Sequence, residues 1–347
     1  MAFKEHVEKT LRISPEPTPL FKMILSAIGV TTPLIIGYFT HHLFVSMFGS
    51  LMGLLYYLND PFGPLINRSK HLLVTYLLLM LALAVGSVCV GNEYFIVGIL
   101  FVLSYMVGKS KNFGLELERM MLFITLQFIT ASSEVVMKLR LNDLLLYSLI
   151  AFINYIVWAA ILFKATRHEV LPMVSKRESV KKIISNDKPS WFPLTCAVFS
   201  CLGYASAKMF EFSHANWIVG TTLIVMLPDS YQSIYKSSQR VIGTTMGVLL
   251  SVAVMTYVHD PKLLILFVFI LSFLMPHGIS KNYWVANIYI AAMIIFFLEI
   301  AAPQSIASHH LAYWRIVDIF IGCLIGVLAA LLLRPDILKR ETKKVGH

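Results

Sequence analysis

Three charged side chains lie within long apolar stretches of the C-terminal part of the sequence: Glu299, Arg315 and Asp318. An ionisable residue in a membrane segment is energetically costly, so each is a candidate for a function, here for coupling. Arg315 and Asp318 are three residues apart, which places them on one face of a helix and within reach of each other. A carboxylate that exchanges an arginine partner for a proton can couple transport to a proton gradient. A static structural pair is the alternative, and the sequence leaves both open.

Three further cations precede apolar segments: Arg240, Arg68 and Lys70. We expect each to lie just before the N-terminus of a membrane helix, where the helix dipole adds partial positive charge. Together they would form a site that captures an organic anion at the cytoplasmic surface. The alternative is that they are ordinary anchors that reach lipid headgroups.

The elements that must position these charges are membrane helices. The chain has 347 residues, of which 57% are hydrophobic and 14% are charged, against about 25% charged residues in ordinary soluble domains. Apolar runs of about 20 residues, the length that a bilayer requires, recur from Phe21 to Leu333. We predict an all-α polytopic membrane protein with about twelve transmembrane helices, at residues 20–40, 43–58, 71–90, 93–109, 114–134, 141–164, 190–209, 215–228, 239–257, 262–277, 282–301 and 313–333. Both termini are expected in the cytoplasm, because most of the 29 lysines and arginines then lie on the inner side.

The sequence also indicates a duplication. A shift of about 170 residues relates Pro19 to Pro189, where the two halves begin, and Lys164 to Arg334, where they end. Six helices is an even number, so the halves would share one orientation as parallel repeats. The expected division is an N-terminal cytoplasmic tail (1–19), a first six-helix repeat (20–164), a basic cytoplasmic linker (165–189), a second repeat (190–334) and a C-terminal cytoplasmic tail (335–347).

Two predicted helices in corresponding places, 43–58 and 215–228, are short. The first ends at Asn59-Asp60-Pro61 and the second at Pro228-Asp229. Paired short or proline-interrupted segments indicate a transport site at the interface of two repeats. The alternative is that both are untilted helices with ends in the headgroup region, and whether they span fully stays open.

The stretch Asn216-Trp217-Ile218-Val219-Gly220, followed by Leu227-Pro228-Asp229 and then by Arg240-Val241-Ile242-Gly243-Thr244-Thr245-Met246-Gly247, resembles the signature of the fusaric acid resistance family. These proteins are aromatic acid exporters of bacterial inner membranes, and plant aluminium-activated malate transporters are more distantly similar. The closing segment from Arg315 to Arg334 is similar to the last helix of the family's module. The resemblance covers about residues 190–334, since the first half lacks the Gly-Thr-x-x-Gly step. It implies a multi-pass inner-membrane protein that exports organic anions such as aromatic carboxylic acids.

From the residues and the resemblance together, we expect the substrate to contact Arg240, Asp229, Trp217, Thr244, Arg68 and Lys70. Trp217 would stack on an aromatic substrate or belong to the interfacial aromatic belt. Thr244 would line a path or bond its own helix. Paired glycines four residues apart are expected to let helices pack closely: Gly243 and Gly247, Gly49 and Gly53, and Gly322 and Gly326. Loop histidines such as His214 are expected to be solvated.

Other classes of function lack their motifs. The sequence has no nucleotide-binding Gly-Lys-Ser/Thr, no His-Glu-x-x-His and no nucleophile elbow, so we predict no enzyme, no cofactor and no metal site. The net charge of +10 fits the positive-inside bias and anionic lipids as partners, with no nucleic acid. A second copy of the chain or a periplasmic adaptor are candidate partners besides the small organic anion. The prediction is a secondary transporter, with an uncoupled organic-anion channel, or a membrane enzyme or assembly factor for lipid-linked substrates, as the alternatives.

Overall fold

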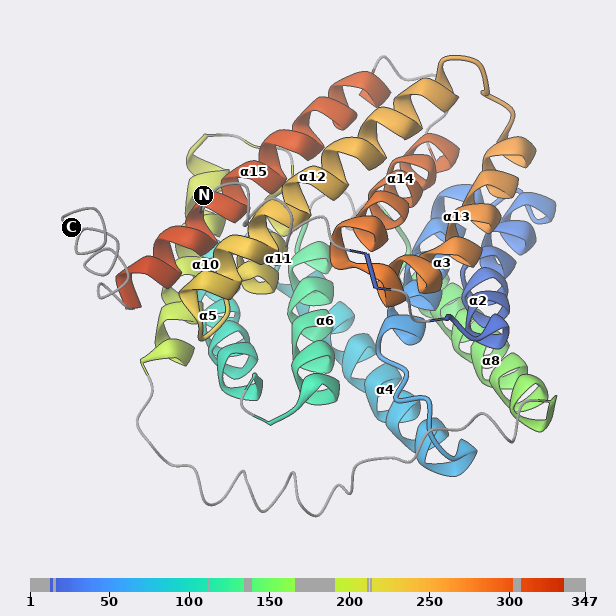
Figure 1. The fold of residues 1–347 in the computed structure, drawn as a ribbon, viewed down its shortest axis with the longest axis horizontal. Helices are drawn as coiled ribbons and strands as arrows, with labels where there is room; N and C mark the ends of the chain where they lie inside the picture. Colours follow the sequence, from blue (N-terminus) through green and yellow to red (C-terminus); the bar gives the residue numbers. More distant parts are fainter. Residues whose placement is uncertain are drawn as a thin grey trace.

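The computed structural model describes residues 13–14, 17–111, 113–133, 139–165, 191–210, 212, 214–301 and 307–333. Within these residues all regular structure is α-helical (Figure 1). The helices are α2 (Leu20–Phe39), α3 (Leu43–Leu58), α4 (Leu65–Cys89), α5 (Glu93–Ser110), α6 (Leu115–Ala131), α8 (Leu141–Ala165), α10 (Phe192–Met209), α11 (Ala215–Val225), α12 (Ser230–Met255), α13 (Pro261–Lys281), α14 (Tyr283–Ala301) and α15 (Ala307–Leu333).

Eight of the helices in the described part of the chain are long and apolar enough to cross a membrane: α2, α4, α5, α8, α12, α13, α14 and α15. The short helices α3 and α11 are apolar too, with 16 and 11 residues. The prediction of an all-α polytopic membrane protein is confirmed. The number of spans and the side of the membrane on which the termini lie stay predictions, and the predicted tails and the linker fall almost entirely outside the described residues.

Three helix starts, those of α4, α12 and α15, lie six or more residues before the predicted ones. Two of these differences move the predicted anion site. Helix α4 begins at Leu65 and α12 at Ser230, so that Arg68, Lys70 and Arg240 lie inside helices instead of before them. The side chain of Asp229 caps α12 by accepting a hydrogen bond from the backbone N–H of Tyr231 (3.0 Å). The first turns of α12 are polar but still pack, because the small side chains of Ser230, Ser233 and Ser237 are buried.

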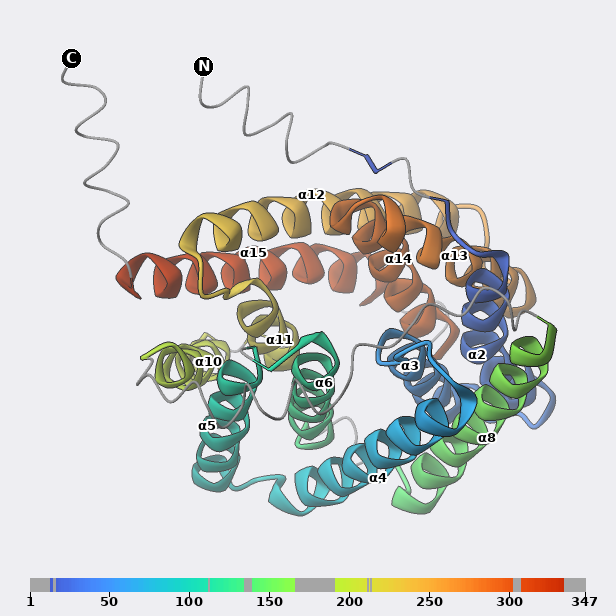
Figure 2. The same cartoon turned by 60° about the horizontal axis from the view of Figure 1, so that its bottom comes forward.

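Several contacts between helices occur twice, once in each half of the chain. The pair α2 and α3 has its counterpart in α10 and α11, the pair α3 and α8 in α11 and α15, and the pair α4 and α6 in α12 and α14. The halves also interlock: α5 packs on α10 of the other half, and α13 packs on α2 (Figure 2). These contacts show that neither half forms a separate body, and the repeat stays a prediction.

Besides these pairs, four more helices meet between the halves: α3, α6, α11 and α14. Helix α3 contacts α14, and α6 contacts α11, so each contact joins the two halves. Helices α12 and α15 lie along one side of this group in Figure 2, and α4 lies on the other. The short helices α3 and α11 are therefore central, and their role at a transport site stays a prediction.

Close backbone contacts hold the second half together at its glycines. A Cβ atom added to Gly322 of α15 would lie 2.7 Å from the carbonyl oxygen of Ile218 in α11. One added to Gly243 or Gly247 of α12 would overlap carbonyl oxygens of α14, those of Trp284 and Ile288. In the first half, one added to Gly49 would lie 3.0 Å from the Tyr147 carbonyl oxygen, and one added to Gly53 would overlap that of Gly29. A side chain at these positions must push two backbones apart.

Replacing Gly247 by Leu should therefore reduce the amount of folded protein, because α12 and α14 cannot both stay in place. The yield of monodisperse protein in detergent, measured by size-exclusion chromatography, should fall severalfold, and so should that of Gly243→Leu. Gly98→Leu is the matched control, since nothing lies within 4 Å of a Cβ added at this exposed position of α5. A normal yield and melting temperature of Gly247→Leu would contradict the close contact between α12 and α14.

Candidate functional site

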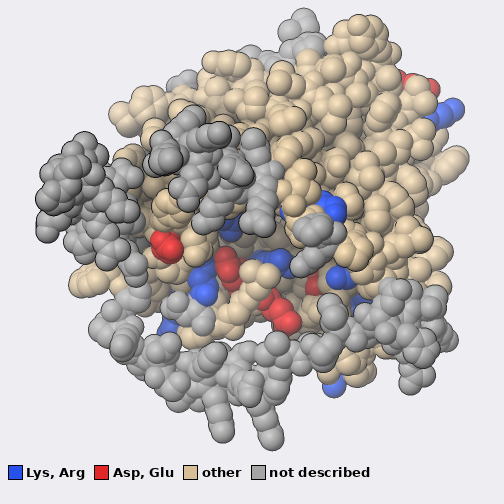
Figure 3. All heavy atoms as spheres, in the orientation of Figure 1, with Lys and Arg blue, Asp and Glu red and all other residues tan. Residues whose placement is uncertain are grey.

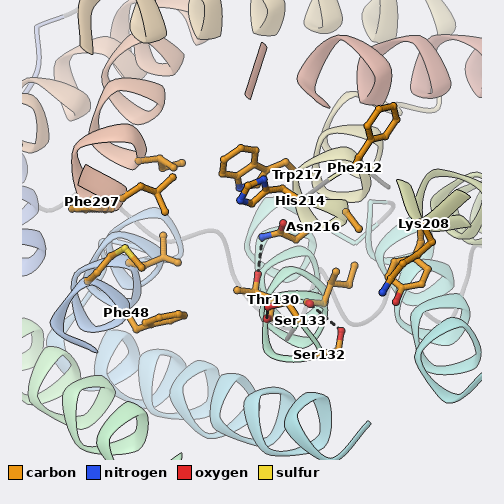
Figure 4. A pocket seen from close by; sticks show the side chains of 17 residues that line it. Phe48, Thr130, Ser132, Ser133, Lys208, Phe212, His214, Asn216, Trp217 and Phe297 are labelled. Atoms are coloured by element: carbon orange, nitrogen blue, oxygen red, sulfur yellow. Dashed lines mark hydrogen bonds between the residues drawn. The ribbon is translucent and has the colours of Figure 1, made fainter. Parts of the chain in front are cut away.

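A cavity of about 370 Å³ lies between the two halves, among α3, α6, α10, α11 and α14. One side is apolar and is formed by Met47, Phe48, Leu51, Ile294, Phe297 and Leu298. The other side is polar and carries Thr130, Ser132, Ser133, Asn216, Tyr204 and Lys208 (Figure 4). The amide nitrogen of Asn216 donates to the hydroxyl of Thr130 (3.2 Å), which joins the halves across this wall. Such a cavity suits a ligand with an apolar body and a polar group.

Trp217, in the first turn of α11, lines the cavity and is covered on both faces. The ring of His214 stacks on it with centroids 4.0 Å apart and planes at 8°. The guanidinium carbon of Arg315 lies 4.1 Å from the ring centroid. Two groups this close to one ring cannot share a face, so Trp217 is held between them. This is a cation–π contact on one side and an aromatic stack on the other.

His214 is half-buried and differs from the solvated loop residue that the sequence predicted. Its Nδ1 atom is buried without a hydrogen-bond partner among the described residues. Burial, with a smaller contribution from the positive charge of Arg315, lowers the pKa of His214 to about 4. The imidazole is therefore neutral at physiological pH and can accept or donate one hydrogen bond at the cavity.

Asp318 lies one turn beyond Arg315 on α15, and its side chain is fully buried. Within the described part of the chain, neither of its carboxylate oxygens has a hydrogen-bond partner, and neither has the Nε of Arg315. The predicted static pair is thus not formed in this structure, because the guanidinium rests on Trp217 instead. Glu299, the third predicted coupling residue, is buried in α14.

Arg240 lies in the eleventh position of α12, about 15 Å along the helix from its start. Its guanidinium donates to the hydroxyl of Thr221 (3.2 Å), the hydroxyl of Tyr283 (2.9 Å) and the amide oxygen of Asn287 (3.4 Å). All three partners are neutral, and no carboxylate of the described residues forms an ion pair with it. A half-buried cation without a carboxylate partner attracts an anion.

Three more cations form a group, in which Lys236 in α12 lies within electrostatic range of Lys111, after the end of α5, and of Arg119 in α6. We call these three residues the basic end. The ammonium of Lys111 donates to the carbonyl oxygens of Leu223 (2.7 Å) and Met226 at the end of α11, and lies 4.0 Å from Glu118. Arg119 donates to the carbonyl oxygen of Leu58 at the end of α3 (3.1 Å). Burial lowers the pKa of Lys111 to about 8, which leaves it mostly charged at neutral pH. Figure 3 shows charged side chains gathered in a hollow near the middle of one face.

The first half contains a closed ion pair instead of a free cation. Arg68 donates through Nε to Oδ2 of Asp60 (2.7 Å), and the hydroxyl of Tyr155 donates to the same oxygen (2.7 Å). The backbone N–H of Phe62 donates to Oδ1 (3.0 Å). Arg68 is buried and neutralised, and Lys70 is exposed on the outer face of α4. The structure therefore does not bring Arg68 and Lys70 together with Arg240 as one free cationic site.

The second half matches known proteins. Residues 200–329 match the family described as fusaric acid resistance protein-like. The chain is 24% identical over 136 residues to the inner membrane protein YccS of Escherichia coli strain K12, which covers 39% of this chain and 18% of that protein. We refer to residues 200–329 as the fusaric acid resistance protein-like region, after the family that they match.

An uncharacterized protein of Haemophilus influenzae is 26% identical over 155 residues, which covers 44% of this chain and 21% of that protein. The match thus spans about a fifth of the length of these relatives. No solved structure matches the chain significantly.

The fusaric acid resistance protein-like region holds most of the predicted site residues, and the structure separates their roles. Trp217 and Arg315 are in contact, and Arg240 is within electrostatic range of Arg315. Thr244 is buried one turn beyond Arg240 on the same face of α12. Asp229, expected at the substrate, instead uses its side chain to cap α12.

Sequence reasoning missed Lys111 and Lys236. No local signal distinguishes Lys111 from a lipid anchor, since its partners in α11 are more than a hundred residues away. Lys236 lies one turn before Arg240, and the correct start of α12 would have shown that the two share a helix face.

Replacing Arg68 by Gln should destabilise the protein, because Asp60 would keep a buried charge without its partner. Losing one member of a buried pair costs about 3–5 kcal/mol, so the melting temperature in detergent should fall clearly. The double variant Asp60→Asn with Arg68→Gln should regain part of this loss. Lys70→Gln, two residues away and exposed, is the control and should melt like the parent. If Arg68→Gln and the parent have the same melting temperature, the ion pair of Asp60 and Arg68 does not stabilise the protein as expected.

Proposed function

We propose that the chain is a bacterial inner-membrane secondary transporter that exports organic anions, with aromatic carboxylates as the substrates. The observation that carries this proposal is Arg240, a cation inside an apolar helix whose partners are all neutral. A protein keeps such a residue at a cost, and an anionic ligand removes that cost. The match to an inner membrane protein supports the location, and the fusaric acid resistance protein-like region supports transport.

The cations suggest a route for the anion. Lys111 and Lys236 at the basic end would attract it from the cytoplasm, where the positive-inside bias places this end. Arg240 follows along α12, within electrostatic range of both Lys236 and Arg315. Arg315 and Trp217 then lead to the cavity between the halves. Each step passes the anion to a cation that is not fully neutralised.

The cavity favours an aromatic carboxylate over a small inorganic anion. Its apolar wall, with Phe48 and Phe297, can cover a ring, and its polar wall offers hydroxyl and amide groups. Its cation Lys208 is bound by Glu93 (2.7 Å), so the wall adds little net charge of its own. A ligand there is held mainly by apolar contact, which a small inorganic ion cannot provide.

The proposal is tested by replacing Arg240 with Gln and measuring uptake of labelled 4-hydroxybenzoate into inside-out vesicles. Transport should fall about tenfold or more, because hydrogen bonds to a charged group are lost, while the protein level stays near normal. Arg240→Lys should keep part of the transport, since it retains the charge without the fork of donors. Arg140→Gln, at an exposed position before α8, is the control. If the Gln variant at 240 transports like the parent, Arg240 does not bind the substrate.

Coupling to protons would use Asp318, whose buried oxygens have no described partner. Asp318→Asn mimics the protonated acid, so it should abolish transport driven by a pH gradient and leave exchange of labelled for unlabelled 4-hydroxybenzoate intact. Reconstituted vesicles with and without an imposed pH gradient separate the two activities. Gradient-driven transport at the parental rate would exclude Asp318 as the coupling residue, and transport that follows the electrical gradient alone would favour a channel.

A further inference from the structure

Arg315 lies near two groups that can hold a guanidinium, Trp217 and Asp318, and in the structure it contacts Trp217. Its guanidinium lies against Trp217, while the carboxylate of Asp318, three residues along the same face of α15, has no partner among the described residues. Side chains three residues apart on a helix are neighbours, so rotation of the Arg315 side chain brings it from the ring to the carboxylate. The two positions exclude each other because there is one guanidinium.

We propose that Arg315 is a two-position switch, with Trp217 as the contact that links occupancy of the cavity to protonation of Asp318. In the position seen here, Arg315 rests on Trp217 and Asp318 is the neutral acid. In the other, Arg315 pairs with ionised Asp318. This inference rests on the proposed role of Asp318 in coupling, and it adds the residue that connects that role to the substrate.

The proton transfer in this switch is simple. When Arg315 leaves the ring, the O–H bond of the Asp318 carboxylic acid breaks, the proton goes to water, and the carboxylate pairs with the guanidinium. When Arg315 returns to Trp217, the carboxylate takes a proton back. No other reactant is needed, and the net charge of the pair changes by one. A buried carboxylate without a partner favours its neutral form, as the first position requires.

Trp217 is the residue through which the cavity can reach the switch. It lines the cavity, whereas Arg315 and Asp318 are not among the lining residues. One of its faces carries Arg315 and the other carries His214, whose buried Nδ1 has no described partner. A ligand that displaces His214 or shifts the indole ring changes the surface on which the guanidinium rests. The ligand need not touch Arg315 itself.

Close packing of α11 on α15 hinders movement of the two helices past each other, so the switch uses rotation of the Arg315 side chain. Helices α11 and α15 are in close contact at Gly322, where an added Cβ would lie 2.7 Å from the carbonyl oxygen of Ile218. At Gly326 an added Cβ would overlap the side chain of Val225. This close contact fixes the backbones of α11 and α15 relative to each other, and so fixes the positions of Trp217 and Arg315. A sliding of one helix past the other would separate these surfaces.

The charged and titratable groups near the switch come from several helices. Arg315 lies on the same helix as Asp318, Arg240 of α12 lies within electrostatic range of Arg315, and neutral His214 lies at the start of α11. Helix α14 carries the buried Glu299, and Lys208 of α10 is bound by Glu93. The movable cation nearest to Asp318 is therefore Arg315. Removing its resting place on Trp217 should leave it beside Asp318.

The experiment measures the protonation of Asp318 directly, in the purified full-length protein in lipid nanodiscs. Infrared spectroscopy records the carbonyl band of the protonated acid, which is assigned by its loss in Asp318→Asn. In Trp217→Leu the midpoint of this band should move to lower pH by about one unit or more, a tenfold change in proton affinity. Trp217→Phe should move the midpoint less than Trp217→Leu does, because a smaller aromatic face is still present. Trp191→Leu, at an exposed tryptophan, should titrate like the parent.

Two further measurements make the result decisive. In an Arg315→Gln background, Trp217→Leu should no longer move the midpoint, because the cation that responds is absent. Addition of 4-hydroxybenzoate should move the midpoint of the parent and not that of Trp217→Leu. An unchanged midpoint in Trp217→Leu overturns the switch, even if the protein transports 4-hydroxybenzoate. If Trp217→Leu moves the midpoint but the parent transports no aromatic carboxylate, the switch stands and the proposed function is refuted.

Discussion

Buried positive charge is the constraint on which the arrangement of the second half depends. A cation inside an apolar helix bundle needs hydrogen-bond acceptors or an aromatic face from the protein, since it is not hydrated there. Arg240 uses two hydroxyls and an amide, and Lys111 uses carbonyl oxygens at the end of α11. Arg315 uses the face of Trp217. Among the described residues, no carboxylate lies within ion-pair distance of Arg240 or Arg315, whereas Lys111 lies 4.0 Å from Glu118.

In the first half, the buried cation Arg68 has a carboxylate partner instead of neutral ones. There Asp60 binds Arg68 directly, and Tyr155 and the backbone of Phe62 complete the coordination of the carboxylate. This network joins the end of α3 to α4 and α8, and the charges of Asp60 and Arg68 cancel each other within it. Similar helix contacts thus support a neutral, closed site in one half and a charged, open site in the other. The asymmetry is consistent with one half acting as scaffold while the other handles the ligand.

Interlocking of the halves brings the charged helices to the cavity. Helix α5 supplies Lys111 to the end of α11, although it belongs to the other half, and Glu93 at its opposite end holds Lys208 and Tyr204 of α10. Close glycine contacts fix α12 against α14 and α15 against α11. With backbones so near, small movements of side chains have consequences at a distance, and large movements must carry groups of helices together.

The sequence by itself determined the membrane class, the positions of the helices and the presence of unusual charges. The range 43–58 predicted for α3 agrees with the structure, and α5 differs by a single residue, because hydropathy and breakers are local properties. The predicted starts of α4, α12 and α15 were wrong. In α12 the reason is that polar residues such as Ser230 and Ser233 resemble a loop in the sequence, although they are buried in the structure.

Only the tertiary structure decided which charge is neutralised and which is free. Arg68 and Arg240 looked alike in the sequence, and Asp60 binds one while neutral groups bind the other. The partners of Lys111 are 112 and 115 residues away, and the ring that holds Arg315 lies on another helix. A local pattern records the type of a residue, but the free energy of a buried charge depends on the groups that distant segments bring within a few ångströms of it.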